Sequence, residues 1–332
     1  MRNSVFIIIC VAIVVAIVLD VCLGTVYISP SAIVDALVNP SSSTDHYIIT
    51  QLRLPRALMA VIAGGGLSLA GLLMQTLFRN PLAGPFVLGI SSGAGLGVAL
   101  LVMGGSLLGI ASISGLGIVT ASMIGSIAVL LLILLMSVRI KDTMGLLIVG
   151  LMVGSLSSAV VGILAYFSSS QQLQRYVYWS LGSLGNLEWH EIGIMSLLFF
   201  VSILLLITIL KPLNALLLGE SYARSLGINI KRTRWIIIAI TSILAGSITA
   251  YAGPIAFIGL AVPHLARLIL PTINHKRLIP VALALGALLL VLCDIIAQLP
   301  FLNYMLPINA VTSILGAPVV IWLILKKRNL HF

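Results

Sequence analysis

Residues 211–235 read KPLNALLLGESYARSLGINIKRTRW and lie between two long apolar runs. Pro212 is suited to start a short helix, because the N–H that proline lacks would have no helical partner there. Gly219 is suited to end that helix, and Glu220 to open a second one with its charge near the N-terminus. Gly227 would close the second helix. The stretch therefore predicts two short polar helices that interrupt an apolar chain.

The same stretch is strongly basic, since it contains Arg224, Lys231, Arg232 and Arg234. Lys and Arg gather in the cytoplasmic loops of membrane proteins, so we expect this stretch to face the cytoplasm. Two interpretations follow from the residues alone. The helices form either a connector on the lipid surface or a docking site for a soluble partner.

The composition indicates a membrane protein. Of the 332 residues, 60% are hydrophobic and only 8% are charged, which is too few charges to cover the surface of a soluble protein. A net charge of +10 would suggest nucleic acid for a soluble domain, but a membrane explains it better if the cations lie on one side. Cys10, Cys22 and Cys293 fall in apolar runs without metal-ligand spacing, so they are interpreted as small core residues.

About ten apolar stretches are long enough to cross roughly 30 Å of hydrocarbon as helices. They are residues 5–27, 56–77, 87–105, 113–137, 145–167, 191–210, 235–251, 255–270, 279–297 and 309–325. The first is too long for a signal-peptide core and is interpreted as a transmembrane helix. Stretches rich in Gly and Pro favour broken helices within some spans. The sequence thus predicts an all-α, polytopic integral membrane protein.

The positive charges predict the orientation. With the N-terminus inside, only Arg53, Arg56 and Arg175 among the 18 Lys and Arg residues fall outside. The remainder are cytoplasmic: Arg2, Arg79, Arg139, Lys141, Lys211, Arg224, Lys231, Arg232, Arg234, Arg267, Lys276, Arg277, Lys326, Lys327 and Arg328. An even number of spans then places both termini in the cytoplasm.

The chain carries no motif for an energy source or for catalysis. It has no G-x-x-x-x-G-K-[ST] phosphate loop, no H-E-x-x-H and no paired catalytic carboxylates. Asp20 and Asp294 are its intramembrane carboxylates. Asp294 has two interpretations: half of an ion-coupling site, or a satisfied interior group near the outer rim, which we favour. The chain is therefore interpreted as a membrane path that receives work from elsewhere.

Five short motifs, in order, resemble the permease subunits of ATP-binding-cassette importers for iron-siderophores, haem and cobalamin. The resemblance extends over about residues 51–325. The motifs are QLRLPR at 51–56, RNPLA at 79–83, GE…A…LG at 219–227, FIGL…PH…R at 257–267 and GAP at 316–318. One motif alone would be modest evidence, whereas five in order on the predicted spans are specific.

The resemblance implies a type II ABC importer permease fold of about ten transmembrane helices. Residues 1–332 would form a single permease domain, and residues 211–234 its cytoplasmic coupling-helix loop. Two permease subunits would surround one path, with two cytoplasmic ATPases beneath and a periplasmic or lipid-anchored substrate-binding protein outside. We expect a homodimer in the bacterial cytoplasmic membrane that contacts lipid and no nucleic acid. ATP and Mg would belong to the ATPase, so this chain is expected to hold no cofactor or metal and to be no enzyme.

In the family, the matching loop sits in a cleft of the ATPase, so the resemblance favours docking over a lipid-surface connector. The implied coupling residues are Leu213, Leu216, Leu217, Gly219, Glu220, Ala223, Arg224, Leu226 and Gly227. Leu216, Leu217 and Leu226 would supply apolar contact to the ATPase, with Glu220 and Arg224 as polar partners.

Arg53 and Arg56 match family arginines that pair with glutamates of the binding protein, a contact suited to guanidinium. Without the resemblance they would be interpreted as residues that extend to lipid head groups. Where the cobalamin permease has a third docking arginine, this chain carries Gln298, which leaves the identity of the partner open.

The resemblance also implies a cytoplasmic gate made of Asn80, Leu82, Thr143 and Met144, although Met144 stands where the cobalamin permease has serine. From the residues alone, Asn80 and Pro81 predict an ordinary stiff turn, which is compatible with a gate.

Residues 171–187 would form a short re-entrant or interfacial helix near the outer mouth. Its Tyr176, Tyr178 and Trp179 favour an interfacial aromatic belt over contacts to a flat ligand. No residue distinguishes haem, a ferric siderophore and a corrinoid, and the breadth of the family makes an iron chelate the default substrate. The alternative function is a secondary transporter that is driven by an ion gradient through Asp294.

Overall fold

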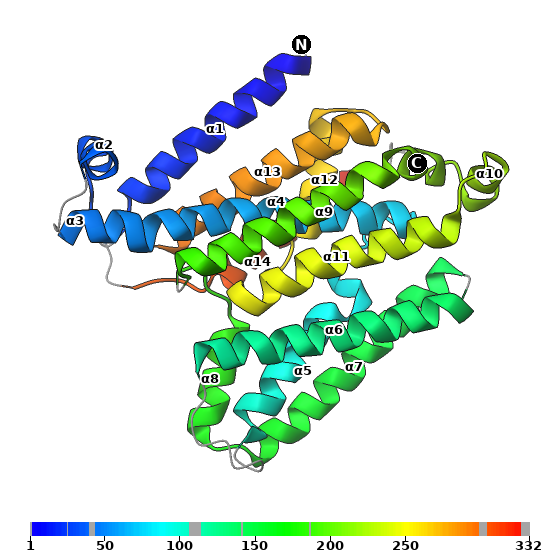
Figure 1. Ribbon diagram of the computed structural model, residues 1–332, viewed down its shortest axis with the longest axis horizontal. Coiled ribbons are helices and arrows are strands. Elements are labelled where there is room, and N and C mark those ends of the chain that lie inside the picture. The colour runs from blue at the N-terminus through cyan, green and yellow to red at the C-terminus, as the bar shows by residue number, and fades with distance from the viewer. Residues whose placement is uncertain are drawn as a thin grey trace. The chain divides into compact units, whose positions relative to one another are not determined.

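The computed structural model describes residues 2–24, 26–39, 44–105, 114–140, 142–185, 187–298 and 304–326 (Figure 1). Every regular element in these ranges is a helix and none is a strand, so the all-α prediction is confirmed. Three residues that were predicted to be cytoplasmic, Lys141, Lys327 and Arg328, lie outside the described ranges.

The elements follow one another along the chain as α-helices, with one π-helical segment (η1) and one 3-10 segment (η2). They are α1 (Arg2–Cys22), α2 (Pro30–Val38), α3 (Thr44–Tyr47), η1 (Ile48–Arg53), α4 (Leu54–Phe78), η2 (Pro85–Leu88), α5 (Ile90–Val102), α6 (Gly115–Arg139), α7 (Thr143–Phe167), α8 (Ser170–Ser180), α9 (Trp189–Leu216), α10 (Glu220–Ser225), α11 (Ile230–Ala252), α12 (Ile258–Ile269), α13 (His275–Ala297) and α14 (Ile308–Lys326).

In the described part of the chain, seven helical runs are long and apolar enough to cross a membrane. One of them is the continuous run Thr44–Phe78, which joins α3, η1 and α4. Three shorter apolar helices, Ile90–Val102, Ile258–Ile269 and Ile308–Trp322, accompany them. Each predicted span coincides with one helix of these two groups. The hydropathy of the sequence therefore located the spans correctly.

Two of the short apolar helices are preceded by broken backbone, as the Gly- and Pro-rich sequence predicted. Before α5, the 3-10 turn Pro85–Leu88 is followed by Gly89, whose φ is 72°. Before α12, Gly253 has φ 74° and Phe257 has φ 64°. Such positive φ values are accessible to glycine but strained for phenylalanine. Both helices begin after these breaks, which shortens them to 13 and 12 residues.

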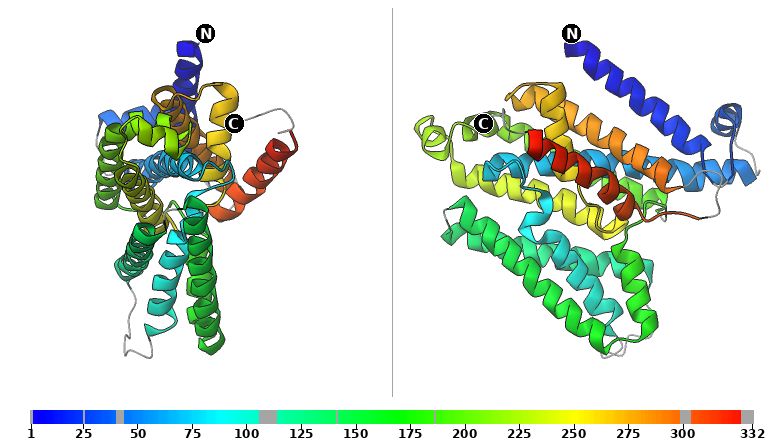
Figure 2. Two further views of the ribbon diagram at one scale, coloured as in Figure 1. Left: turned by 90° about the vertical axis from the view of Figure 1, so that its right-hand side faces the viewer. Right: turned by 180° about the vertical axis from the view of Figure 1, so that it is seen from behind.

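The chain divides into two compact units. The first comprises Met1–Leu69, Ser183–Phe199 and Ile255–Phe332, and the second comprises Ala70–Gly182 and Phe200–Pro254. In the first unit, α13 lies against α1, α12 and α14 (Figure 2). In the second, α5 lies between α6 and α7, and α11 packs against α5 and α6.

Within each unit, glycines allow helix backbones to touch. A Cβ on Gly64 of α4 would lie 2.2 Å from the carbonyl oxygen of Gly286 in α13. A Cβ on Gly97 of α5 would lie 2.1 Å from the carbonyl oxygen of Ala121 in α6. Because lipid is as apolar as a side chain, such close packing is a main force that holds helices together in a membrane. The glycines therefore serve packing.

The predicted short helix that starts at Pro212 is wrong. α9 runs without interruption from Trp189 to Leu216 and contains Pro212 inside it. Ile209, Leu213 and Leu216 share one helix face and are buried. Continuing the helix keeps this face buried in spite of the roughly 3 kcal/mol that an interior proline costs. Burial, which the local sequence does not reveal, carries the helix through the proline.

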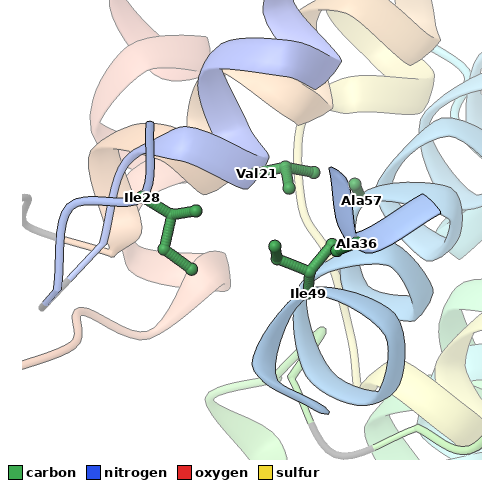
Figure 3. Packing of buried hydrophobic residues seen from close by; sticks show 5 residues of the cluster. All are labelled: Val21, Ile28, Ala36, Ile49 and Ala57. Carbon is green, nitrogen blue, oxygen red and sulfur yellow. The ribbon is translucent and has the colours of Figure 1, made fainter. Parts of the chain in front are cut away.

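A small apolar core closes one end of the first unit. Val21 of α1, Ile28, Ala36 of α2, Ile49 of η1 and Ala57 of α4 converge there (Figure 3). This core brings the C-terminal end of α1 to the start of α4, where Arg53 and Arg56 are located.

Candidate functional site

The predicted coupling segment is one short helix, α10, held between two glycine turns. Gly219 has φ 109° and directly precedes α10, whereas Gly227 has φ 78° and follows it. At the C-terminal end, the N–H of Ile228 donates to the carbonyl of Ala223 (3.1 Å), and the N–H of Gly227 to that of Arg224 (3.0 Å). This hydrogen-bond pair is the glycine-dependent Schellman ending. The turns bound α10 on both sides, and Gly227 closes the helix as the sequence predicted.

The segment has an inner and an outer face. Leu213, Leu216 and Ala223 are buried and form its inner face. Leu216 was predicted to touch an ATPase, but its side chain is turned inward and is not accessible to a partner. Leu217 is half-buried, and Leu226 is 58% exposed.

Two outward residues were missed by the sequence reasoning. Leu218 is 60% exposed and Tyr222 is 51% exposed. Leu226, which directly follows α10, is exposed as well, so large apolar side chains are exposed before the helix (Leu218), within it (Tyr222) and after it (Leu226). We name Leu218, Tyr222 and Leu226 the α10 apolar row; Arg224 is exposed on the same helix.

Glu220 has an internal partner. Its Oε1 accepts a hydrogen bond from Nη2 of Arg234 in α11 at 2.9 Å, and the Arg234 side chain is buried. Nη1 of Arg234 donates to the carbonyl oxygen of Ile140, the residue that follows α6, at 3.3 Å. One guanidinium therefore joins α10, α11 and the end of α6 within the second unit.

The first predicted gate loop follows α4 and is a tight turn. Arg79 has φ 47°, a left-handed conformation that is uncommon for residues other than glycine. Asn80 Oδ1 accepts the N–H of Leu82 at 2.9 Å, which stiffens the turn as the Asn-Pro sequence predicted. The Leu82 side chain is exposed. The gating role of Asn80 and Leu82 stays a prediction.

The second predicted gate loop lies between α6 and α7. Asp142 caps α7, since its Oδ2 accepts the N–H of Gly145 at 2.9 Å. Thr143 and Met144 form the first turn of α7, and the Met144 side chain is exposed. Their role at a gate stays a prediction as well.

Arg53 lies at the opposite end of the predicted topology, in the first unit, and is buried. Its Nη1 donates to the carbonyl oxygens of Val21 (2.5 Å) and Cys22 (3.1 Å), and its Nη2 donates to that of Val26. These carbonyls belong to the C-terminal end of α1 and the loop after it, where helical partners are lacking. A Cβ on Gly24 would lie 2.9 Å from Arg53 Nη2, so glycine leaves room for the guanidinium.

Arg56 forms a buried ion pair with Asp294 of α13. Its Nε and Nη2 donate to the two carboxylate oxygens at 2.7 and 2.8 Å. Asp294 is fully buried, and 12% of the Arg56 side chain is exposed. Nε2 of Gln298 donates to Asp294 at 3.2 Å and to Asp20 of α1 at 2.8 Å. The predicted satisfied interior role of Asp294 is confirmed, and Gln298 joins the two carboxylates.

The structure therefore gives both predicted docking arginines internal partners. Arg53 already has three acceptors, and two nitrogens of Arg56 are bound to Asp294. The third, Nη1 of Arg56, lies 3.5 Å from the sulfur of Met305. Their contact with a binding protein stays a prediction, and Arg56 is the better placed of the two.

The short helix expected over residues 171–187 is α8, which spans Ser170–Ser180 and so ends earlier than predicted. Ser169 and Gln172 form a capping box at its start. Tyr176 and Trp179 stack at a centroid distance of 6.1 Å, and burial raises the pKa of the Tyr176 hydroxyl. Tyr178 is exposed. Aromatic residues with one exposed neighbour suit an interfacial belt, although no contact shown here distinguishes it from a ligand contact.

Among the described residues, no group of three or more His, Cys, Asp or Glu could hold a metal ion. Cys10, Cys22 and Cys293 are free thiols, and the last two are buried.

Residues 12–326 match the model of the FecCD transport family. The chain belongs to this family. It is 36% identical over 314 residues to the vitamin B12 import system permease protein BtuC of Citrobacter koseri, covering 95% of this chain and 92% of that one. BtuC of Salmonella schwarzengrund is 37% identical over 311 residues, covering 94% and 91%.

Solved structures agree with this assignment. A metal-chelate type ABC transporter in an inward-facing conformation matches with a TM-score of 0.86 and 29% identity, covering 98% of this chain and 99% of that one. PsaBC from Streptococcus pneumoniae, with a TM-score of 0.56 and 16% identity, shares the fold alone. This chain is accordingly the multi-pass permease subunit of an ABC importer, a subunit type that is not itself an ATPase. The alternative interpretation, a carrier driven by an ion gradient through Asp294, is therefore wrong. Asp294 instead forms an ion pair with Arg56.

Proposed function

We propose that this FecCD-family permease forms a homodimer in the bacterial cytoplasmic membrane. It imports a bulky metal chelate, meaning an iron-siderophore, haem or cobalamin, that a substrate-binding protein delivers outside. Two ATPase subunits dock on the cytoplasmic ends, and ATP and Mg belong to them. Support comes from the names of the relatives, which are vitamin B12 permeases, and of the matched structure, a metal-chelate type transporter.

The observation that carries the ATPase contact is the α10 apolar row. Three large apolar side chains stand exposed on a projection that is rich in Lys and Arg, a charge pattern that favours the cytoplasm over the outside. Exposed apolar side chains on a rigid projection suit a cleft in a soluble protein, where they supply the central contact of an interface. Glu220 and Arg224 provide polar contacts at its edge.

The test is co-purification of the ATPase with tagged permease. Tyr222→Asp places a charge in the centre of the row, and a matched Tyr304→Asp changes an exposed tyrosine on the side predicted to be outside. Loss of a central interface residue costs about 2 kcal/mol or more, roughly a thirtyfold loss of affinity. We expect Tyr222→Asp to release the ATPase and Tyr304→Asp to retain it. Equal retention by both variants would refute docking at α10.

The substrate is identified by uptake into vesicles that contain the permease, its ATPase and its binding protein. Labelled haem, a ferric siderophore and cobalamin are supplied in turn with ATP inside. ATP-dependent accumulation of one of them assigns the substrate class, with an iron chelate as our first expectation. Accumulation of none of the three would refute the proposed substrate class while leaving the ATPase contact to its own test.

A further inference from the structure

Arg234 is a buried arginine in the second turn of α11, a helix whose start is capped by Asn229. No sequence motif singled it out beyond its charge. Its two terminal nitrogens bind different elements, Glu220 at the start of α10 and the backbone of Ile140 after α6. A planar guanidinium holds two acceptors in a fixed geometry, which a lysine ammonium does not.

The acceptor at Ile140 belongs to a very short connection. α6 ends at Arg139 and α7 begins at Thr143. Asp142 binds the N–H of Gly145 at 2.9 Å, and a Cβ on Gly145 would lie 3.0 Å from the Cγ2 of Ile140. The connection is thus tied to the first turn of α7 at both of its described residues. The Ile140 carbonyl therefore lies next to the N-terminal turn of α7 and is a direct route by which that turn can be displaced.

The acceptor on Glu220 is equally well fixed. Glu220 is the first residue of α10, directly after the positive-φ Gly219, and Ala223 one turn later is fully buried. α10 therefore moves as a rigid body with its Glu220 carboxylate. A force on the α10 apolar row reaches Arg234 through a 2.9 Å charge-assisted hydrogen bond.

Arg79, next to the first predicted gate loop, also approaches this turn. A Cβ on Gly219 would lie 3.7 Å from its Nη1. Arg79 occupies a left-handed position where glycine would be unstrained. The turn between α9 and α10 thus lies beside Arg79, the residue that precedes the first predicted gate loop.

We propose that Arg234 is the positioning residue that transmits displacement of α10 to the connection between α6 and α7. It binds neither substrate nor ATP and acts through the Ile140 carbonyl on Thr143 and Met144. The inference rests on the proposed docking of the ATPase at α10. It goes beyond that function by naming the physical link between the docking site and one cytoplasmic loop.

The test uses Met144→Cys as a reporter in the permease–ATPase complex, labelled with a hydrophilic maleimide. The labelling rate is compared without nucleotide and with ATP plus vanadate, and labelling of the chain without Met144→Cys is subtracted. The variants are Arg234→Gln, Arg234→Lys and Glu220→Met, with Arg232→Gln as the matched control, because Arg232 is an exposed arginine of the same helix.

We expect the two rates to differ by about fivefold or more in the reporter chain and in Arg232→Gln, the lower end for coupling between sites. In Arg234→Gln the ratio falls toward one although the ATPase still co-purifies and hydrolyses ATP. Arg234→Lys restores part of the ratio, because a lysine keeps the charge opposite Glu220 but not the two-pronged geometry.

A ratio that is unchanged in Arg234→Gln would overturn the proposal, and so would loss of ATPase binding in that variant, which would make Arg234 a mere anchor of α10. If Arg234→Gln does not fold, Glu220→Met decides, since Glu220 is partly exposed and methionine has a similar length but no oxygen to accept the hydrogen bond from Arg234. An undiminished ratio there also overturns the proposal. Failure of the ATPase to bind the unaltered chain would instead refute the proposed function.

Discussion

The buried pair of Arg56 and Asp294 allows a quantitative prediction about stability. Arg56→Met removes the guanidinium but keeps a long apolar side chain of similar reach. It leaves Asp294 fully buried, with the Gln298 amide and the Asp20 side chain as its neighbours. The double variant Arg56→Met, Asp294→Leu removes both charges and restores apolar packing.

The magnitude follows from the desolvation of the carboxylate. Removing one partner of a buried ion pair costs about 3–5 kcal/mol, because an uncompensated charge remains. Because the Gln298 amide still donates a hydrogen bond to Asp294, we expect a cost near the lower end of this range. With an unfolding entropy of about 2.1 cal/mol/K per residue, the 332 residues have roughly 0.7 kcal/mol/K. A cost of about 3 kcal/mol then corresponds to a drop in melting temperature of about 4 °C.

The reverse change should be milder. Asp294→Leu leaves Arg56 unpaired, but 12% of its side chain is already exposed. A long cationic side chain can extend its head group to water while keeping its stem buried. We therefore expect Arg56→Met to have a lower melting temperature than Asp294→Leu. The melting temperature of the double variant should be closest to that of the unaltered chain.

The assay exploits two buried thiols. Cys22 and Cys293 are buried, so a thiol-reactive fluorophore reports unfolding in detergent as the temperature rises. The reasoning would be refuted if Arg56→Met melted within about one degree of the unaltered chain, since the drop expected for an unpaired carboxylate is several degrees. A double variant as unstable as Arg56→Met would show that the charge is not the cause.

Two further predictions concern the backbone. Gly64→Ala would place its Cβ 2.2 Å from the Gly286 carbonyl oxygen and force α4 away from α13, so it should cost about 1–3 kcal/mol and lower the melting temperature. Gly193→Ala is the control, because a Cβ there would have no atom within 4 Å and should leave the melting temperature unchanged. Equal melting temperatures of the two variants would contradict the close packing of α4 and α13. Arg79→Gly should raise the melting temperature, because it relieves about 1 kcal/mol of strain in the left-handed backbone conformation. The same change should lower ATP-driven uptake, because it removes the side chain beside Gly219. Unchanged uptake would show that the Arg79 side chain is dispensable for transport.

Much of the fold was predictable because each span must satisfy its own backbone in lipid. An apolar run of sufficient length has to be a helix there, so hydropathy located the helices without knowledge of tertiary contacts. Gly219 and Gly227 were predictable for a similar local reason. Positive φ at a helix boundary is inexpensive for glycine alone, so the turns around α10 follow from residue type.

The failures have a common cause. Pro212 was expected to begin a helix, but buried Ile209, Leu213 and Leu216 carry α9 past it. Leu216 was expected to face a partner, but it points inward, whereas Leu218 and Tyr222 point outward. Local helix propensity does not reveal which face of a segment is covered by another part of the chain. In each of these cases, the covered face determined the helix boundary or the direction of the side chain.

The residue pattern alone is enough to identify an all-α membrane protein, the helix ends that bear most of the positive charge, and the permease family that the chain resembles. The partners of its polar side chains, in contrast, follow only from tertiary contacts. Arg56 binds Asp294 across 238 positions of sequence, and Arg234 binds the Ile140 carbonyl across 94. Such pairs form because a buried charge must find an acceptor wherever the folded chain places one, and distance along the sequence carries no information about that place.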